Sequence, residues 1–177
     1  AEAEIIIEGE VLPGEYADEG PFGEFAGYMG PVAKKPVVRI TAITHRKDAI
    51  YYGYTSQMPP SESTVLQSMT NGPLILKTLR EDIGDKSVKD VHIDLTFGGL
   101  LAHCVVSMTP MHDGHAKKVG RLIADMTPLK RVTLVDDDID IRDPLHIEWA
   151  MNSHYHPVRD TIIIDDVFFP MGMDPSV

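Results

Sequence analysis

Hydrophobic and polar residues alternate along the first sixty positions in the manner of β-strands. "EIIIEGEVL" is rich in β-branched residues, and "KPVVRITAITH" places Val38, Ile40 and Ala42 on one face and Arg39 and Thr41 on the other. A repeat of two residues is that of a half-buried strand. "HRKDA" interrupts the pattern as a polar, hairpin-like turn before a further strand-like run, "IYYGYT". Short strands joined by Gly/Pro loops predict an antiparallel barrel or sandwich.

The next stretch changes from strand-like to helix-like spacing. The two prolines of "QMPPSEST" stop a strand, and Ser61 or Ser63 is suited to cap a helix. "TVLQSM" and "LILKTLRED" follow as helical segments, and we expect "TNGP" to separate them. Residues 61–87 are therefore interpreted as a helical linker.

From residue 88 the chain alternates strands and helices. "VKDVHIDL", "LLAHCVVSM", "RVTLVDD" and "TIIIDD" are the predicted strands. "HDGHAKKVGRLIADM" is a predicted helix with Asp113 as N-cap and an apolar stripe through Val119 and Ile123. "DPLHIEWAMNSH" is a second helix, with Asp143 as N-cap and Pro144 in its first turn. This alternation predicts a small α/β domain with a layered sheet, so that the whole chain is α+β or α/β.

Composition narrows the class of protein. The chain has 177 residues, 43% of them hydrophobic, which suits one domain or two small ones with a real core. Its net charge of -11 disfavours nucleic acid and anionic membranes as partners. One cysteine excludes an internal disulfide, and no apolar run approaches the roughly 18 residues of a membrane helix. We expect a cytoplasmic protein. The first residues already lie in a strand-like run without a Met, so we also expect a fragment of a longer protein or one chain of a processed one.

One loop carries candidate chemistry. "DEGPFGEFAGYMG", residues 18–30, places Glu19 and Glu24 around a Gly-Pro-Phe-Gly turn among aromatic residues. The glycines allow a tight turn and Pro21 stiffens it, so the two carboxylates can converge on one site. Carboxylates close together, beside aromatic side chains that exclude water, titrate at different pH values. One of them can then hold a proton near neutral pH and act as a general acid. The alternative is a solvated turn with incidental acids, because acidic turns are common.

Three strings, taken together, resemble one known family. They are "EIIIEGEV…EGPFGEFAGYMG", "RITAITHRKDAIY" and "VTLVDDDIDIRDPLHIEWAMNSHYHP". In this order they resemble the UbiD family of reversible decarboxylases, which use prenylated flavin mononucleotide (prenylated FMN), and the resemblance covers essentially the whole chain. It implies that residues 1–60 are the second part of a split-barrel flavin domain. It also implies that residues 61–87 are the linker and residues 88–177 most of an α/β sandwich oligomerisation domain.

The same resemblance implies roles for four residues. Glu19 and Glu24 would join an arginine in an acid/base network beside the flavin, with Glu24 as the proton donor in contact with the cofactor and Glu19 as the charge-balancing partner. Phe25 maps to a substrate-lining position, and Gln67 to another through a loop alignment. The substrate would be an aromatic, heteroaromatic or α,β-unsaturated carboxylic acid.

The chain departs from the family pattern in what it lacks. The family arginine and the metal ligands, an Asn, a His and a Glu for Mn²⁺ with K⁺ as a second ion, come from upstream of this motif. Here no arginine precedes Arg39 and no histidine precedes His45. We therefore predict that the chain alone is inactive, holds no metal, and needs a missing N-terminal portion that another chain could supply.

Two other functions stay open at this stage. The first is a non-catalytic assembly module that forms a homo-oligomer, dimer or higher, through residues 88–177. The second is an ordinary flavin reductase or flavin-binding domain. The paired glutamates argue against this second function, because hydride transfer does not require them.

The remaining chemistry-bearing residues are predicted to have structural roles. "DDDIDIRD", residues 136–143, lacks the glycine and the terminal glutamate of an EF-hand, so it reads as a solvated loop. Zinc would need more ligands than the paired histidines offer. We predict that His112 and His115 are surface or capping residues and that His154 and His156 serve packing or a subunit contact. Trp149 is predicted to be a core or interface residue, and Cys104 an inert core residue.

Overall fold

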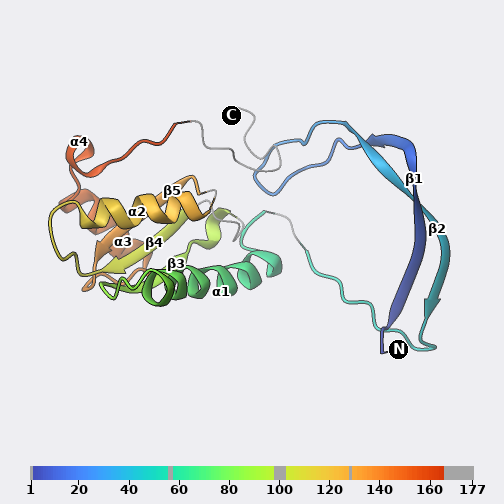
Figure 1. Cartoon of the computed structure of the whole chain (residues 1–177), viewed down its shortest axis with the longest axis horizontal. Coiled ribbons are helices and arrows are strands. Elements are labelled where there is room, and N and C mark those ends of the chain that lie inside the picture. The colour runs from blue at the N-terminus through green and yellow to red at the C-terminus, as the bar shows by residue number, and fades with distance from the viewer. Residues whose placement is uncertain (1, 56–57, 98–102, 128, 166–177) are drawn as a thin grey trace.

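The computed structural model describes residues 2–55, 58–97, 103–127 and 129–165, and its fold is mixed α+β. An antiparallel ribbon is formed by β1 (Ile5–Glu19) and β2 (Ala33–His45). A separate three-stranded sheet is formed by β3 (Val88–Ile93), β4 (His103–Met108) and β5 (Arg131–Asp136). The ribbon stands at one end of the molecule and the sheet with its helices at the other, joined by extended chain after β2 (Figure 1). The mixed class agrees with the sequence prediction, whereas closure into a barrel or sandwich stays a prediction.

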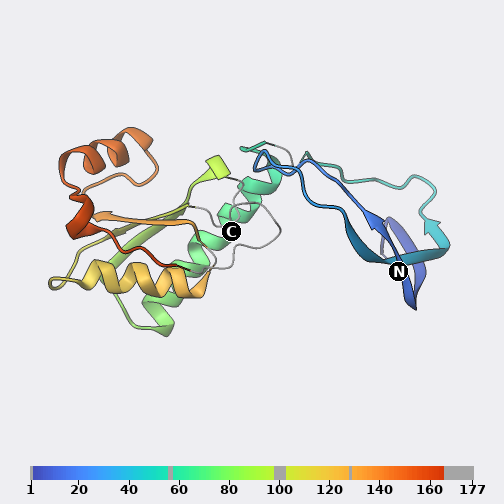
Figure 2. The ribbon, with the colours of Figure 1, turned by 90° about the horizontal axis from the view of Figure 1, so that it is seen from above.

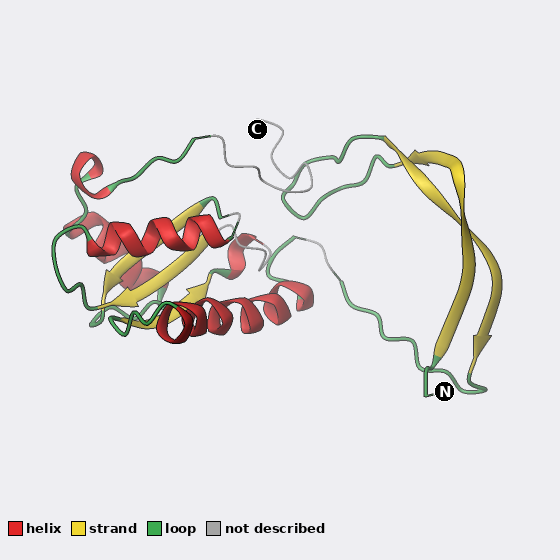
Figure 3. Ribbon diagram, viewed as in Figure 1, coloured by secondary structure: helices red, strands yellow, loops and turns green. Residues whose placement is uncertain are grey.

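Helices flank the sheet and follow it in the chain (Figure 3). The long helix α1 precedes β3, and the long helix α2 connects β4 to β5. The shorter helices α3 and α4 follow β5. Their bounds are α1 (Glu62–Lys77), the π-helix η1 (Thr78–Asp82), the 3₁₀-helix η2 (Leu95–Phe97), α2 (His115–Met126), α3 (Pro144–Ser153) and α4 (Pro157–Asp160).

The ribbon exposes apolar side chains along its length. Ile7 is 61% exposed, and Val38 and Ile40 are each 58% exposed. An isolated two-stranded ribbon is marginally stable in water, and an apolar surface of this extent marks a contact with another part of a protein. The ribbon therefore needs a covering surface that the described part of the chain does not supply. The predicted strand "IYYGYT" is wrong, because residues 50–55 pair with no strand in the described part of the chain and Tyr51 is 81% exposed.

The sheet is apolar on the face that α1 and α2 cover. β3 pairs antiparallel with β4, and β4 pairs parallel with β5, so α2 is the crossover between parallel neighbours. Cys104 lies in the middle of this core, and burial raises the pKa of its thiol to about 12, in agreement with an inert role. The core cluster consists of Ile75, Leu79, Val88, Val91, Ile93, Cys104, Val106, Met108, Val119, Ile123 and Leu129.

The helix α1 is longer than the sequence predicted. Ser61 is its N-cap, as expected, but the predicted break at "TNGP" is wrong: the helix continues through Pro73 and runs on into η1. A proline inside a helix costs about 3 kcal/mol, so packing must offset it. Gly72 shows how close that packing is, because a Cβ there would lie 3.0 Å from the backbone oxygen of Val91.

Two further expectations differ at the ends of elements. Gly114, with φ of 80°, is the N-cap of α2 in place of Asp113, because the chain enters the helix through a left-handed conformation that glycine adopts readily. Residues 161–165 of the predicted strand "TIIIDD" pair with nothing in the described chain, so that strand is wrong. Asp143 is confirmed as the N-cap of α3, where its Oδ1 accepts a hydrogen bond from the Leu145 amide at 2.9 Å.

A buried polar network ties the end of η1 to the start of α2. The Met111 amide donates to Nδ1 of His115 at 3.1 Å, so Nε2 carries the proton and donates to Oδ2 of Asp85 at 2.8 Å. Oδ1 of Asp85 accepts from the amide of Ser87 at 3.0 Å and from its hydroxyl at 2.5 Å. Of the two predicted roles, surface or capping, the surface role is wrong for His115, which is 4% exposed, whereas His112 is exposed and stacks on it.

This network makes stability depend on acid pH. Burial by itself raises the pKa of Asp85, but the hydrogen bonds from Ser87 and His115 outweigh it and hold the pKa below its usual range. A carboxyl of this kind stabilises the folded state above its unfolded pKa of about 3.9, and the stabilisation is lost as the pH falls toward the lower folded pKa. We expect Asp85→Asn to lower the free energy of unfolding at pH 7 and to flatten its decline below about pH 4, as measured by urea unfolding.

Asp113→Asn, at an exposed position, is the control for the loss of one negative charge. If the parent and Asp85→Asn lost stability in parallel as the pH falls, protonation of Asp85 would not be the cause of the loss at acid pH.

Candidate active site

The loop between β1 and β2 folds into a small hairpin of its own. The amide of Gly30 donates to the carbonyl of Phe22 at 2.7 Å, and the amide of Glu24 donates to the carbonyl of Tyr28 at 2.8 Å. Gly27, with φ of 87°, closes the tip, and its amide donates to the carbonyl of Glu24 at 3.0 Å. These bonds fix the backbone that carries Glu24.

The four predicted site residues divide between this loop and α1. Glu19 is the last residue of β1 and is exposed. Glu24 is half-buried, and its Oε1 lies 3.3 Å from the place that a Cβ on Gly30 would take, so the carboxylate packs closely against this glycine. Phe25 follows, also half-buried. Glu24 and Phe25 thus lie on the loop and Glu19 directly before it, and the convergence of the two carboxylates stays a prediction.

Two cations of the ribbon, Lys34 and Arg39, bind other carboxylates. Lys34 pairs with Asp18 at 2.8 Å, and the guanidinium of Arg39 binds the carboxylate of Glu15 through two nitrogens. Within the described residues no ion pair involves Glu19 or Glu24. The loop therefore presents two carboxylates whose charge is not balanced by the ribbon.

Gln67 lies on α1, whose start is beside the 20–32 loop in both views (Figures 1 and 2). Its Oε1 is buried and has no hydrogen-bond donor in the described part of the chain. A buried acceptor without a donor costs about 1–3 kcal/mol, and such groups call for an explanation. A donor from outside this chain, or from a bound molecule, would provide one.

A second polar network was missed in the sequence. His103, 7% exposed, has Nε2 3.0 Å from Oγ1 of Thr133, and Arg131 donates to its Nδ1 at 2.9 Å. Oδ2 of Asp94 lies 3.3 Å from the same Nδ1. Burial, aided by the charge of Arg131, lowers the pKa of His103. Strand alternation alone would have put these residues on one face of the sheet. No cluster of three or more metal-ligating side chains occurs among the residues that the structure describes.

Comparison with known proteins identifies the family. Residues 1–59 match the 3-octaprenyl-4-hydroxybenzoate carboxy-lyase Rift-related domain of UbiD, and residues 64–176 match the C-terminal domain of the same enzyme. The chain belongs to the UbiD family. The resemblance found in the sequence is therefore confirmed, and the chain corresponds to the C-terminal portion of UbiD proteins.

Individual relatives agree with this membership. An uncharacterized protein of Synechocystis is 32% identical over 173 residues, which are 96% of this chain and 34% of that protein. An evolved dimeric form of the UbiD-class enzyme HmfF from Pelotomaculum thermopropionicum, solved with prenylated FMN, is 37% identical with a TM-score of 0.79, over 92% of this chain and 37% of the other. Vanillic acid decarboxylase of Sedimentibacter hydroxybenzoicus, in its open form, is 29% identical with a TM-score of 0.83, over 98% and 37%.

The chain thus spans about a third of the length of these UbiD relatives. Among its described helices, none combines the length and the apolar character needed to cross a bilayer.

Proposed function

We propose that this chain is the C-terminal part of a UbiD-type decarboxylase. The enzyme would act reversibly on an aromatic, heteroaromatic or α,β-unsaturated carboxylic acid with prenylated FMN. The observation that carries the proposal is the half-buried Glu24 on the hydrogen-bonded loop of a UbiD chain. The prenylated FMN complex of HmfF and the decarboxylase activity named for the Sedimentibacter enzyme support it. Residues 1–60 would complete a split barrel, residues 61–87 would link, and residues 88–177 would form the oligomerisation domain.

The residues present fit one end of the cofactor. The carboxylates of the loop suit proton transfer. On the neighbouring helix, Oε1 of Gln67, which has no donor in the described part of the chain, suits hydrogen bonding. They do not suit a phosphate, which the carboxylates would repel, and the described residues include no three-ligand metal cluster. The arginine of the network and the ligands for Mn²⁺ and K⁺ would therefore come from outside this chain. When bound, prenylated FMN supplies the electron sink for decarboxylation.

The chemistry of this chain is then proton delivery. When carbon dioxide leaves, the electrons of the broken C–C bond stay on the substrate carbon. The protonated carboxyl of Glu24 gives its proton to that carbon and becomes a carboxylate, which solvent reprotonates. In the direction of carboxylation the carboxylate takes the proton back. Glu19 would help Glu24 to keep its proton, because two close carboxylates do not both ionise readily, while Phe25 would line the substrate and exclude water.

A second role is compatible with the first. The open faces of the ribbon favour a chain that must assemble with another portion before it can work. We propose a homo-oligomer, dimer or higher, with residues 88–177 in the contact, and an N-terminal portion that covers the ribbon. A chain that serves only for assembly would have the same contacts and no catalytic glutamates.

Glu19→Gln in the intact enzyme tests the paired-carboxylate proposal. We expect lower turnover and a shifted pH profile, because the substitution removes the charge that favours proton retention by Glu24. The measurement is kcat as a function of pH, with an aromatic acid as substrate and formation of its decarboxylated product as the signal. A drop in kcat without any change in the shape of the profile would contradict the role of Glu19.

The chain by itself is expected to bind no flavin. Mixed with prenylated FMN and Mn²⁺ and then desalted, the 177-residue chain should be colourless and inactive, because phosphate and metal ligands are lacking among its described residues. Absorption spectroscopy and metal analysis of the desalted protein provide the measurement. A flavin spectrum with stoichiometric manganese would overturn this prediction and the proposed division of the site.

A further inference from the structure

One surface near α3 combines exposed apolar side chains with negative charge. A shallow groove, called here the acidic patch, is lined by Asp138, Ile139, Leu145, His146 and Trp149. Leu145 is 77% exposed and Trp149 is 56% exposed, so of the two roles predicted for Trp149, core or interface, the interface role is the one that its exposure leaves open. The rings of His154 and Trp149 form a T-shaped contact, with their centroids 5.0 Å apart.

The charge of this surface comes from the loop before α3. Residues 136–143 contain five aspartates and a single arginine, Arg142, which binds the carboxylate of Asp90 on β3. Asp138 is exposed and forms no ion pair in the described chain. Asp143 of the same loop lies 3.8 Å from Nε2 of His146. Large apolar side chains beside the remaining negative charge would suit a partner surface that is both apolar and cationic.

A surface with these properties exists on the same molecule. A second shallow groove, called here the basic groove, lies along the end of α1 and η1 and is lined by Pro73, Leu76, Lys77, Arg80, Glu81 and Lys86. Its three cations face one carboxylate, and none of the three forms an ion pair within the described ranges. In a chain with a net charge of -11, such a group of uncompensated cations is a local exception.

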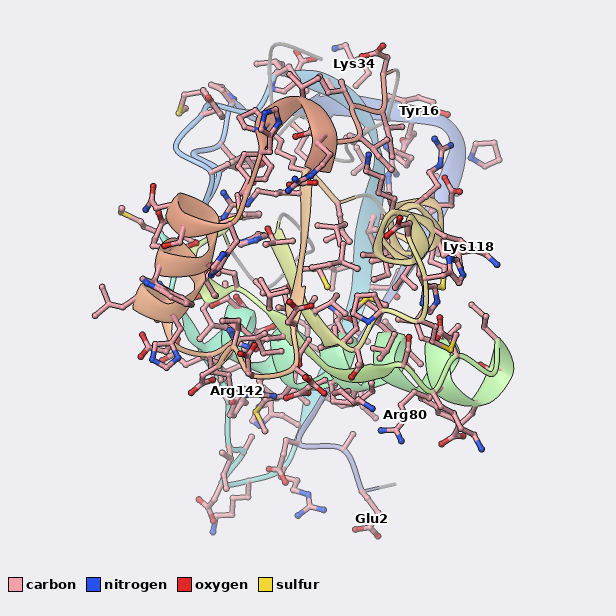
Figure 4. All side chains as sticks on the ribbon, turned by 90° about the vertical axis from the view of Figure 1, so that its left-hand side faces the viewer. Glu2, Tyr16, Lys34, Arg80, Lys118 and Arg142 are labelled. Atoms are coloured by element: carbon pink, nitrogen blue, oxygen red, sulfur yellow. The ribbon has the colours of Figure 1, made fainter. Side chains whose placement is uncertain are left out.

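The two surfaces lie apart within one copy. Arg80, in the basic groove, and Arg142, beside the acidic patch, are seen to the right and to the left in the lower part of the view (Figure 4). Complementary surfaces that lie apart on one molecule can each bind a different copy, and such a heterologous contact closes into a ring when the rotation allows. Attraction between the charges would steer the encounter, and Trp149 and Leu145 would supply buried contact area.

We propose that the acidic patch of one copy docks into the basic groove of a second copy. This inference rests on the oligomerisation proposed above, and it adds that one half of the interface lies before residue 88, on α1 and η1. The contact pairs Trp149 and Leu145 with Pro73 and Leu76, and aspartates of the 136–143 loop with Lys77 and Arg80.

Charge reversal and re-pairing test this contact on the 177-residue chain. One variant carries Lys77→Glu and Arg80→Glu, another carries Asp136→Arg and Asp138→Arg, and a third carries all four changes. Like charges across an interface cost several kcal/mol, so we expect each double variant to weaken association at least about tenfold and the fourfold variant to restore it. Light scattering gives the mass, and emission of Trp149, the only tryptophan, reports its burial. The matched control, Lys117→Glu with Lys118→Glu on exposed positions of α2, should associate like the parent.

The outcomes separate the surface from the oligomer. A parent chain that stays monomeric overturns both the oligomerisation and this contact. A parent that associates, with double variants that associate equally well or a fourfold variant that does not recover, overturns the contact alone. Loss of association in the α2 control would also overturn the contact, because association would then depend on net charge and not on these two surfaces. Flavin binding and turnover of the intact enzyme are not read in this experiment, so its failure leaves the decarboxylase proposal untouched.

Discussion

Replacing Glu24 with glutamine in the intact enzyme is expected to lower turnover by about 10²- to 10⁴-fold, the usual contribution of a general acid. This corresponds to roughly 3–5 kcal/mol of barrier at about 1.36 kcal/mol per tenfold. Glutamine keeps the shape of the side chain against Gly30, and the loop hydrogen bonds of residue 24 come from the backbone, so the loop should fold as before. Flavin should still bind, because its phosphate would be held outside this chain.

Incorporation of deuterium from solvent into the product carbon is the sharpest measurement for this variant. Glu148→Gln, at an exposed position on α3, is the matched control and should turn over like the parent. If Glu24→Gln exchanges deuterium and turns over at the parent rate, another group delivers the proton, and the motif does not carry its family role at this residue.

Removing the side chain of Leu79 is expected to be among the most destabilising single changes in the α/β part. Leu79 lies on η1, is 0% exposed and belongs to the core cluster. Truncation of a buried leucine to alanine costs about 2–5 kcal/mol, because the apolar contacts are lost and a cavity remains. We expect this loss in the free energy of unfolding of Leu79→Ala, measured by urea unfolding with helical circular dichroism as the signal.

Leu74→Ala is the matched control for the same chemical change. Leu74 is 61% exposed on the preceding helix, so its truncation should change stability by no more than about 0.5 kcal/mol. Equal losses for the two variants would mean that η1 does not hold the core together in the way that the burial of Leu79 indicates.

Periodicity predicted the elements whose pattern is carried by their own residues. β3, β4 and β5 are runs of β-branched residues between turns, and α2 has Val119 and Ile123 four residues apart, where one helical face repeats. The cap of α3 was also predictable, because an aspartate directly before a proline at the first helical position is a local signal. These predictions needed no knowledge of the neighbours in space.

The wrong predictions share a different cause, which is dependence on distant partners. "TNGP" reads as a break, but α1 continues because Gly72 lets it lie on β3, a contact that no local pattern shows. "IYYGYT" and "TIIIDD" have strand-like composition, yet a strand also needs a neighbour, and none of the described residues pairs with them. Strand propensity describes how a side chain suits a sheet and does not supply the sheet.

The candidate site was predictable as a set of residue types and a turn. Glu24 and Phe25 lie on one loop and Glu19 directly before it, at the end of β1. The rest of the local structure depends on contacts across the chain: the space at Gly30 that the Glu24 carboxylate occupies, and the buried oxygen of Gln67. The His103 network was missed because its members lie on β4, on β5 and directly after β3, and the pairing of these strands brings them together.

The open ribbon has a consequence for how the chain unfolds. β1 and β2 hydrogen-bond to each other, and their side chains are largely exposed, whereas β4 is fully buried between two neighbours. Amide protons of the ribbon should therefore exchange with solvent through small local openings, and those of β4 only when the whole α/β part opens. The ribbon and the α/β part are then two cooperative units of unequal stability. A single free energy of unfolding describes only the α/β part.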